Sequence, residues 1–302
     1  MTRVVERPPT RILFYRVGYD QRGDRRARSV EIVAKLYGDH TGTRAIASLR
    51  QLRQAGFRPP APHQVPRPYG YSAARKALLQ ARAPGVVWAD VLRHDPSSLA
   101  AASAEAASWL IRLQRCPTRT GFESQPGDLP AVARCAQELM SAFPRHASRL
   151  RPLTERLLSR LGSEGTALVP AHGDFHPENV FVAPGTITVI DFDRLGLREP
   201  AFDVGYALGQ LLAMSYISLG DMAPGARAAS DFWQRYEGEG EARWSRVAVH
   251  AARGMLQSLY WELCALPHSR TELLELWPEL IEEWLRSDGP ATLERFSGHR
   301  SE

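Results

Sequence analysis

The chain has 302 residues, of which 44% are hydrophobic and 24% are charged, and this composition provides enough apolar material for one large domain or two lobes. It excludes an intrinsically disordered chain. No run of about 18 apolar residues occurs, and the first ten residues lack the apolar centre of a secretion signal, so we expect a cytoplasmic protein.

The net charge of +5 is distributed unevenly along the chain. Residues 1–90 contain 17 Lys and Arg against 6 Asp and Glu, whereas the remaining residues contain 21 against 27. A basic segment can bind nucleic acid, a membrane surface or a phosphate-bearing ligand, although a solvated arginine-rich surface explains most of these charges. The three cysteines are too widely spaced for a disulfide framework or a metal motif, and we expect buried or idle thiols: Cys116, Cys135 and Cys264.

The first 83 residues predict a small strand-rich lobe with one helix. Residues 11–20 and 29–39 alternate and are rich in strand formers, with a polar hairpin loop between them. Residues 41–56 have apolar side chains at helical spacing and end at a glycine, which is typical of an amphipathic helix. Residues 76–85 predict a further strand that ends in a Pro-Gly turn.

One lysine in this lobe is a candidate for a functional role. Only Lys35 and Lys76 are lysines among the 38 basic residues, and Lys35 stands in the apolar run VEIVAKLYG, where strand alternation puts it on one face with Val33 and Tyr37. Lysine carries a compact charge on a flexible stem, which suits contact with a phosphate. The alternative is a lysine left by chance at a strand edge.

From residue 84 onward the pattern becomes mostly helical. Residues 98–115, 150–162 and 241–266 are periodic near 3.6 residues. The acidic segment 271–289 could bind a cationic amino sugar, amine or basic peptide. Its glutamates are interleaved with apolar residues at helical spacing, however, and this favours a solvated helix face.

The stretch AHGDFHPENVFVAPGTITVIDFD, residues 171–193, predicts a hairpin with oxygen ligands at its open end. Residues 180–182 and 188–190 are strand-like, and Ala183-Pro184-Gly185 supplies a turn. If Val182 lies opposite Thr188, then Asn179 lies opposite Asp191. Cross-strand partners are about 5 Å apart, so an amide oxygen and a carboxylate there could share one Mg²⁺.

Asp174 precedes this hairpin in a segment that cannot continue as a helix. Pro177 forces His176 into an extended conformation, which predicts an exposed loop at the same end of the hairpin. A carboxylate near a metal-held phosphate can accept the proton of an attacking hydroxyl. The pattern therefore contains the parts that phosphoryl transfer needs.

These residues carry a family resemblance. HGDFHPEN, residues 172–179, resembles the catalytic loop of aminoglycoside phosphotransferases and related small-molecule kinases, and it keeps the D-x-x-x-x-N spacing of protein kinases. IDFD, residues 190–193, resembles the metal-binding segment of the family, and REPAFDVGYAL the helix that follows. VAKLYGD is similar to the strand with the phosphate-contacting lysine, and RAPGVVW to the hinge, so the resemblance spans residues 11–210 in order.

The resemblance implies an α+β, protein-kinase-like bilobal fold with ATP and Mg²⁺ as cofactors. It implies a small β-rich nucleotide-binding lobe with one helix, residues 1–83, and a larger, mostly helical catalytic and substrate-binding lobe, residues 84–302. Position by position, it implies these roles: Asp174 as catalytic base, Asn179 and Asp191 as magnesium ligands, Lys35 as the contact to the α and β phosphates, and Asp193 as a carboxylate near the metal.

Three neighbouring residues are assigned less specific roles. Asp203 matches a buried aspartate of the family, and a helix N-cap is an equally good interpretation. We expect His172 and His176 to brace the loop rather than to take part in catalysis.

Two features depart from the family pattern. No glycine-rich loop precedes Lys35; if residues 3–6 form a first strand, the turn is RPPT, so triphosphate binding would be weaker or would use side chains such as Arg7 and Thr10. The usual helix glutamate is also missing, because no acidic residue occurs between Asp39 and Asp90. We therefore expect the Lys35 ammonium to be unpaired and mobile until triphosphate binds, or held through a neutral hydrogen bond by Ser48 or Gln51.

Three functions compete on this pattern. The leading prediction is an ATP- and Mg²⁺-dependent kinase whose partners are a nucleotide and a hydroxyl-bearing small molecule, with no role for nucleic acid or a membrane. The second is a kinase that acts on Ser or Thr of a peptide, completed by a partner protein over the first strand. The third is a catalytically silent kinase-like module that only binds, which the missing glutamate and glycines favour.

Overall fold

The computed structural model describes residues 3–7, 10–19, 28–117, 129–162, 168–266 and 270–299. The chain forms two compact units. The first contains Met1–Val86 and Phe181–Leu195, and the second contains Val87–Val180 and Gly196–Glu302. The first boundary lies three residues beyond residue 83, and the segment Phe181–Leu195, expected with residues 84–302, groups with the first unit.

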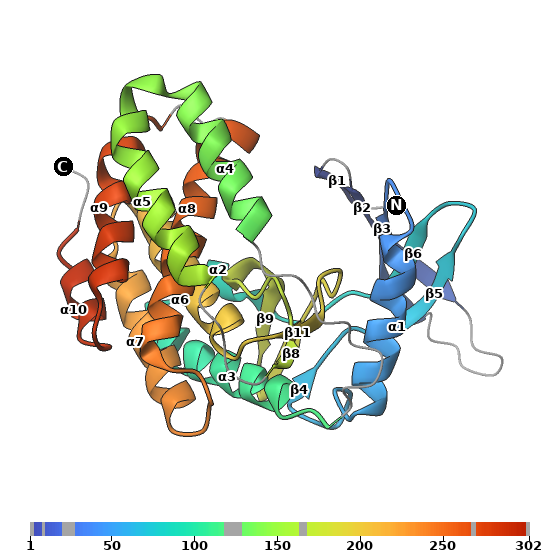
Figure 1. Ribbon diagram of the computed structural model, residues 1–302. Helices are drawn as coiled ribbons and strands as arrows, with labels where there is room; N and C mark the ends of the chain where they lie inside the picture. Colours follow the sequence, from blue (N-terminus) through green and yellow to red (C-terminus); the bar gives the residue numbers. More distant parts are fainter. Residues whose placement is uncertain are drawn as a thin grey trace. The chain divides into compact units, whose positions relative to one another are not determined.

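The first unit is built on a five-stranded antiparallel sheet with one helix beside it. Figure 1 shows α1 (Thr41–Gln54) next to β5 and β6, and five of the six residues that it buries, from Ala45 to Leu52, have the spacing of an amphipathic helix. The strands lie in the order β1 (Arg3–Arg7), β2 (Thr10–Tyr19), β3 (Arg28–Leu36), β6 (Ala77–Ala81) and β5 (Pro68–Ser72).

The strands predicted from residues 3–6, 11–20, 29–39 and 76–85 are confirmed with small shifts of their ends. Arg7 pairs with Thr10, as the predicted first turn requires. The two prolines of that turn, and the polar loop between the next two strands, lie outside the described residues.

A second sheet contains the predicted hairpin. Its strands lie in the order β4 (His63–Gln64), β10 (Thr186–Val189), β9 (Val180–Ala183) and β7 (Val86–Val87). Pro184 and Gly185, at φ +66°, connect β9 to β10, so the predicted turn is confirmed. The second strand begins and ends earlier than the predicted residues 188–190, and the expected pairing of Val182 with Thr188 stays a prediction.

Gly85 lies directly before β7 at a position that only glycine fits. Its φ is +91°, a region that other residues rarely adopt, and an added Cβ would lie 2.1 Å from the Val182 carbonyl oxygen. The Pro-Gly turn predicted after β6 is therefore fixed by the close approach of two backbones.

The second unit is mainly helical, which completes the expected α+β class. It contains α2 (Trp88–His94), α3 (Pro96–Gln114), α4 (Leu129–Ala142), α5 (Ala147–Leu161), α6 (Ala201–Leu219), α7 (Ala223–Glu237), α8 (Trp244–Tyr260), α9 (Leu273–Arg286), α10 (Thr292–Phe296) and the short sheet of β8 (Val169–Ala171) and β11 (Gly196–Arg198). The three helices predicted by periodicity correspond to α3, α5 and α8, although the last gives way to a π-helical turn at Trp261–Ala265.

Helix α6 packs closely on α8. The approach is close because Gly205 has no side chain: a Cβ there would lie 2.3 Å from the Val247 carbonyl oxygen. The first turn of α6 is thereby held firmly, and this turn carries Asp203.

The expectations about membrane-spanning segments and about the cysteines can be compared with the structure. Within the part of the chain that is described, no helix has both the length and the apolarity needed to cross a membrane. All three thiols are free; Cys116 and Cys135 are buried, and Cys264 is partly exposed.

Candidate functional site

The loop of residues 172–179 begins where β8 ends, and Asp203 anchors it. The backbone N–H groups of His172 and Gly173 donate to the two carboxylate oxygens of Asp203, at 2.6 and 2.9 Å. Asp203 is completely buried, and it is the third residue of α6, whose N-cap is Pro200. The N-cap interpretation is therefore wrong, and the carboxylate satisfies two buried backbone donors that would otherwise lack partners.

The backbone of Asp174, further along the loop, is hydrogen-bonded to a buried histidine. The Asp174 N–H lies 3.2 Å from His172 Nδ1, which accepts the hydrogen bond, so the neutral His172 ring carries its proton on Nε2. His172 is completely buried and lies edge-on to the rings of Trp109 and Phe175. The Asp174 side chain itself is 31% exposed. His172 thus braces the backbone, as expected, while the Asp174 carboxylate remains open to a ligand.

Asn179 ends the loop in a fixed orientation. It closes the 3₁₀ turn Pro177–Asn179, and its amide nitrogen lies 3.0 Å from the Asp174 carbonyl oxygen and 3.0 Å from His176 Nε2. Both amide hydrogens are then used. Among the described residues no hydrogen bond reaches the amide oxygen of Asn179, and this oxygen can bind a hard cation. His176 holds the amide and lies 3.8 Å from the Asp174 carboxylate.

In the first unit, Lys35 bridges two carboxylates. Its ammonium lies 2.7 Å from Asp191 Oδ1 and 2.7 Å from Asp193 Oδ2, and its side chain is 12% exposed. Burial acts to lower the pKa of Lys35, but the two carboxylates outweigh it and raise the pKa above the usual value. The expectation of an unpaired, mobile ammonium is wrong, because its partners come from the segment after β10 instead of from α1.

Asp193 is itself held by two further groups. The Tyr37 hydroxyl donates to Asp193 Oδ1 at 2.8 Å, and Arg44 of α1 donates to the Asp193 carbonyl oxygen at 3.3 Å. Burial and the charge of Asp191 raise the pKa of Asp193 against the effect of Lys35. Burial, and the charge of Asp193, also raise the pKa of Tyr37, which keeps its hydroxyl a donor.

The backbone of Asp191 has an uncommon conformation. Its φ is +68°, in the left-handed region, where aspartate is one of the few residues other than glycine to occur regularly. The structure thus brings Lys35, Asp191 and Asp193 together in one unit, and Asp174 and Asn179 together in the other. Their carboxylate and amide oxygens are the donor types that Mg²⁺ prefers.

Sequence reasoning missed Tyr37 and Arg44 as members of this site. A signal for Tyr37 was present, because strand alternation puts it on the face of Lys35. No comparable signal identified Arg44, since exposed arginines are common in this chain.

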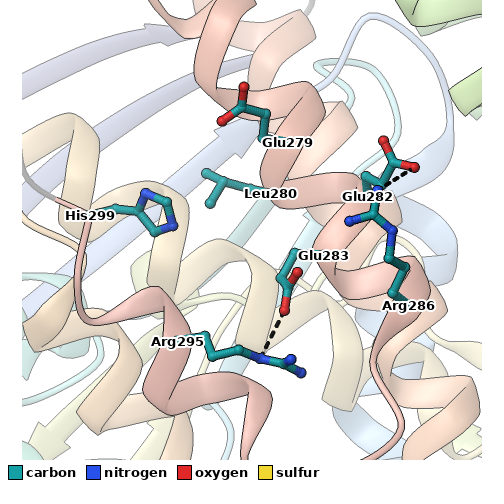
Figure 2. Close-up of a pocket in the computed structure, with 7 residues that line it drawn as sticks. All are labelled: Glu279, Leu280, Glu282, Glu283, Arg286, Arg295 and His299. Atoms are coloured by element: carbon teal, nitrogen blue, oxygen red, sulfur yellow. Dashed lines mark ion pairs between the residues drawn. The ribbon is translucent and has the colours of Figure 1, made fainter.

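The acidic face of α9 is paired with arginines. A surface pocket of about 430 Å³ lies at this face. Figure 2 shows two ion pairs among its lining residues: Glu282 with Arg286 and Glu283 with Arg295. The nitrogen-to-oxygen distance is 2.8 Å in each pair. Glu282 also pairs with Arg156 of α5, and Arg149 of α5 pairs with both Glu275 and Glu279. Because these charges are compensated within the unit, the face favours a solvated helix surface over a site for a cationic substrate.

A partly buried ionic group joins the segment just before α6 to α8. Glu199 receives two hydrogen bonds from Arg246, at 2.6 and 2.8 Å, and lies 2.6 Å from His250 Nε2. Burial would raise the pKa of Glu199, but the hydrogen bonds from Arg246 and His250 lower it to about 2. Burial lowers the pKa of His250 to about 4, in spite of its bond to Glu199. The group fixes the turn that presents Asp203.

We expect this histidine to make the fold acid-sensitive. The native state keeps His250 neutral down to about pH 4, whereas the unfolded chain binds a proton below its ordinary pKa of 6.5, so stability is lost as the pH falls through this window. The free energy of unfolding should fall by about 2 kcal/mol from this group between about pH 7.5 and pH 5. Urea unfolding at both pH values measures this loss of stability in the unmodified protein and in His250→Gln. The loss should be smaller in His250→Gln by the contribution of His250. An equal loss in both proteins would contradict the assignment.

Comparisons with known proteins give the chain a family and a fold. A model of the phosphotransferase enzyme family matches residues 14–250. A methylthioribose kinase of Erwinia tasmaniensis is 38% identical over 148 residues, which are 48% of this chain and 36% of that protein. The matched segment is thus a minor part of that relative.

Two solved structures share the fold at low sequence identity. A thermostable mutant of an aminoglycoside phosphotransferase has a TM-score of 0.63 at 14% identity, covering 94% of each chain. A choline/ethanolamine kinase family protein from Mesorhizobium loti has a TM-score of 0.60 at 15% identity, covering 90% of this chain and 88% of that chain. The expected protein-kinase-like fold is confirmed.

Proposed function

Because the chain belongs to the phosphotransferase enzyme family, as its resemblance at residues 172–193 predicts, we propose that it transfers the γ-phosphate of ATP to a hydroxyl group of a small molecule with Mg²⁺ bound. One observation carries the proposal. The acidic and amide groups that such a transfer needs are held in place: Asp174 and Asn179 by the hydrogen bonds of their loop, and Asp191 by Lys35.

In the proposed reaction the oxygen of the acceptor hydroxyl attacks the γ-phosphorus. The bond from this phosphorus to the β,γ-bridging oxygen breaks, ADP leaves, and the hydroxyl proton passes to the Asp174 carboxylate. Lys35 would contact the α and β phosphates. We assign nucleotide binding to the lobe of residues 1–83 and acceptor binding to the lobe of residues 84–302.

Asn179 and Asp191 would hold the Mg²⁺, with Asp193 beside it. A bound Mg²⁺ would neutralise charge on the phosphates. The chain order supports this assignment, since Asn179 directly precedes β9 and Asp191 follows β10 by two residues, and these neighbouring strands are joined by a two-residue turn.

The relatives support a small acceptor over a peptide. The sequence relative is named a methylthioribose kinase, and a glucosamine kinase shares the fold at 19% identity, so we propose to screen sugar and amino-sugar hydroxyls first. We further propose that the enzyme works in the cytoplasm, where ATP is abundant. The silent-module alternative loses one of its two arguments, because Lys35 has acidic partners despite the missing helix glutamate.

Replacing Asp191 with alanine tests the metal assignment. Thermal unfolding should show that ATP with Mg²⁺ stabilises the unmodified protein more than ATP alone, and that this magnesium-dependent part disappears in Asp191→Ala. Asp39→Ala is the control, since that exposed carboxylate accepts a hydrogen bond from the Thr41 N–H just before α1 and has no place in the proposed metal site. Equal magnesium dependence in Asp191→Ala and Asp39→Ala would refute Asp191 as a ligand.

Screening hydroxyl-bearing compounds for ADP release then tests the reaction itself. We expect ADP to form faster with a sugar or amino-sugar acceptor than in its absence. Nucleotide binding without accelerated ADP release for any sugar, amine or peptide acceptor would instead favour the silent module.

A further inference from the structure

Lys35 is held although α1 offers no acidic residue to hold it. No Asp or Glu occurs between Asp39 and Asp90, and the two partners of the ammonium are Asp191 and Asp193. These carboxylates differ in their surroundings. The Asp193 side chain is 21% exposed, against 32% for Asp191, and Asp193 alone of the two accepts a hydrogen bond from Tyr37.

Helix α1 supports Asp193 without an acidic residue. A Cβ at Gly42 would lie 2.6 Å from the rings of both Tyr37 and Tyr71, so the glycine allows the two rings to lie against the helix. Two residues further along the helix, Arg44 donates to the Asp193 carbonyl oxygen. Side chain and backbone of Asp193 are therefore both fixed from the β3–α1 region.

The two carboxylates cannot serve the same purpose once a metal binds. If Asp191 ligates Mg²⁺, the cation competes with Lys35 for that carboxylate. Asp193 offers one oxygen to Tyr37 and the other to Lys35, so its contact with the ammonium can persist.

We propose that Asp193, oriented by Tyr37, positions Lys35 for the nucleotide phosphates. Asp193 then has the role that related kinases assign to a glutamate on the helix corresponding to α1. Tyr37 is then a positioning residue that acts through Asp193. This inference rests on the proposed function, since it concerns how that site binds a nucleotide.

The chain offers a direct measurement that needs no nucleotide. Lys35 and Lys76 are its only lysines, so a protein labelled with ¹⁵N and ¹³C in lysine gives two sets of side-chain signals, which Lys35→Met assigns. We expect Asp193→Asn to shift and broaden the Lys35 signals and Tyr37→Phe to do so in part. The Lys76 signals, from an ammonium bound to the Gly38 carbonyl oxygen, should stay unchanged.

Tyr71→Phe is the matched control for Tyr37→Phe. The Tyr71 ring lies against the same glycine, but its buried hydroxyl has no hydrogen-bond partner among the described residues. Both variants keep the aromatic ring, so a difference between them reports the hydroxyl. Equal Lys35 spectra in Tyr37→Phe, Asp193→Asn and the unmodified protein would overturn the proposal.

Nucleotide affinity supplies the second test. By calorimetry with MgATP, Tyr37→Phe should weaken binding by about 3- to 10-fold and Asp193→Asn by about 10-fold or more, while Tyr71→Phe leaves it unchanged. In a protein that already carries Lys35→Met, Asp193→Asn should weaken MgATP binding by less than about a further 2-fold, because Asp193 then has no ammonium to position. A full effect in that background would identify Asp193 as a metal ligand instead and overturn the proposal.

A rescue variant guards against a merely structural effect. Ser48 lies one turn beyond Arg44 on the same face of α1, so Ser48→Glu should restore most of the affinity and the Lys35 signals lost in Asp193→Asn. If the unmodified protein fails to bind MgATP, the proposed function fails, and the lysine spectra still decide whether Asp193 and Tyr37 hold Lys35.

Discussion

Asp174→Asn is expected to lower kcat by about 10²-fold or more while leaving MgATP affinity close to that of the unmodified protein. The amide has the size of the carboxylate but cannot accept the proton of the acceptor hydroxyl. The loop should keep its shape, because Asp174 is held through its backbone N–H and carbonyl oxygen, which the substitution does not alter. Steady-state ADP release with the acceptor from the screen gives kcat, and calorimetry gives the affinity.

Glu178→Gln is the control for this prediction. Glu178 belongs to the same loop and its side chain is 38% exposed, at 4.0 Å from Arg93. An exposed ion pair of this length contributes little, so turnover should stay near that of the unmodified protein. Should Asp174→Asn turn over acceptor as fast as Glu178→Gln, Asp174 is not the base.

Local pattern was sufficient for most of the elements around the site. The spacing of apolar residues identified α1, α3 and α8, because an amphipathic helix needs only one buried face to be recognised. Alternation identified β2 and β3 in the same way. The hairpin of β9 and β10 followed from its Pro-Gly turn, although the end of the second strand did not.

The partners of Lys35 could not be found by the same reasoning. Asp191 and Asp193 lie 156 and 158 residues away, and the expectation relied on the nearest helix, which has no acidic residue. A long-range ion pair depends on how distant segments pack, and periodicity carries no information about that. The family pattern places a glutamate on that helix, so its absence suggested that Lys35 has no ion pair.

Asp203 shows the same limit on a shorter scale. An aspartate near the start of a helix predicts a cap, because side-chain capping is a local rule. The structure uses its carboxylate for the backbone of residues 172 and 173, about 30 positions earlier in the chain. Burial distinguishes the two interpretations, since a cap at a helix end is usually exposed and Asp203 is not.

Replacing Asp203 is expected to be among the most damaging single changes in the second unit. In Asp203→Asn, one carboxylate oxygen becomes an NH₂ group that faces a backbone N–H, so one buried donor loses its acceptor and meets a second donor. The free energy of unfolding should fall by about 3 kcal/mol, the scale for a broken buried charge-assisted contact. Turnover should fall as well, because the same hydrogen bonds place the loop that carries Asp174.

Urea unfolding and ADP release together separate this anchor from an ordinary cap. Asp221→Asn is the control, since Asp221 accepts from the Ala223 N–H at the start of α7, and an asparagine amide oxygen can accept the same hydrogen bond at little cost in stability. We expect Asp203→Asn to lose clearly more stability than Asp221→Asn and to lose turnover even under conditions where it remains folded. If the two variants unfold alike and both keep the turnover of the unmodified protein, the carboxylate of Asp203 does not set the geometry of the loop.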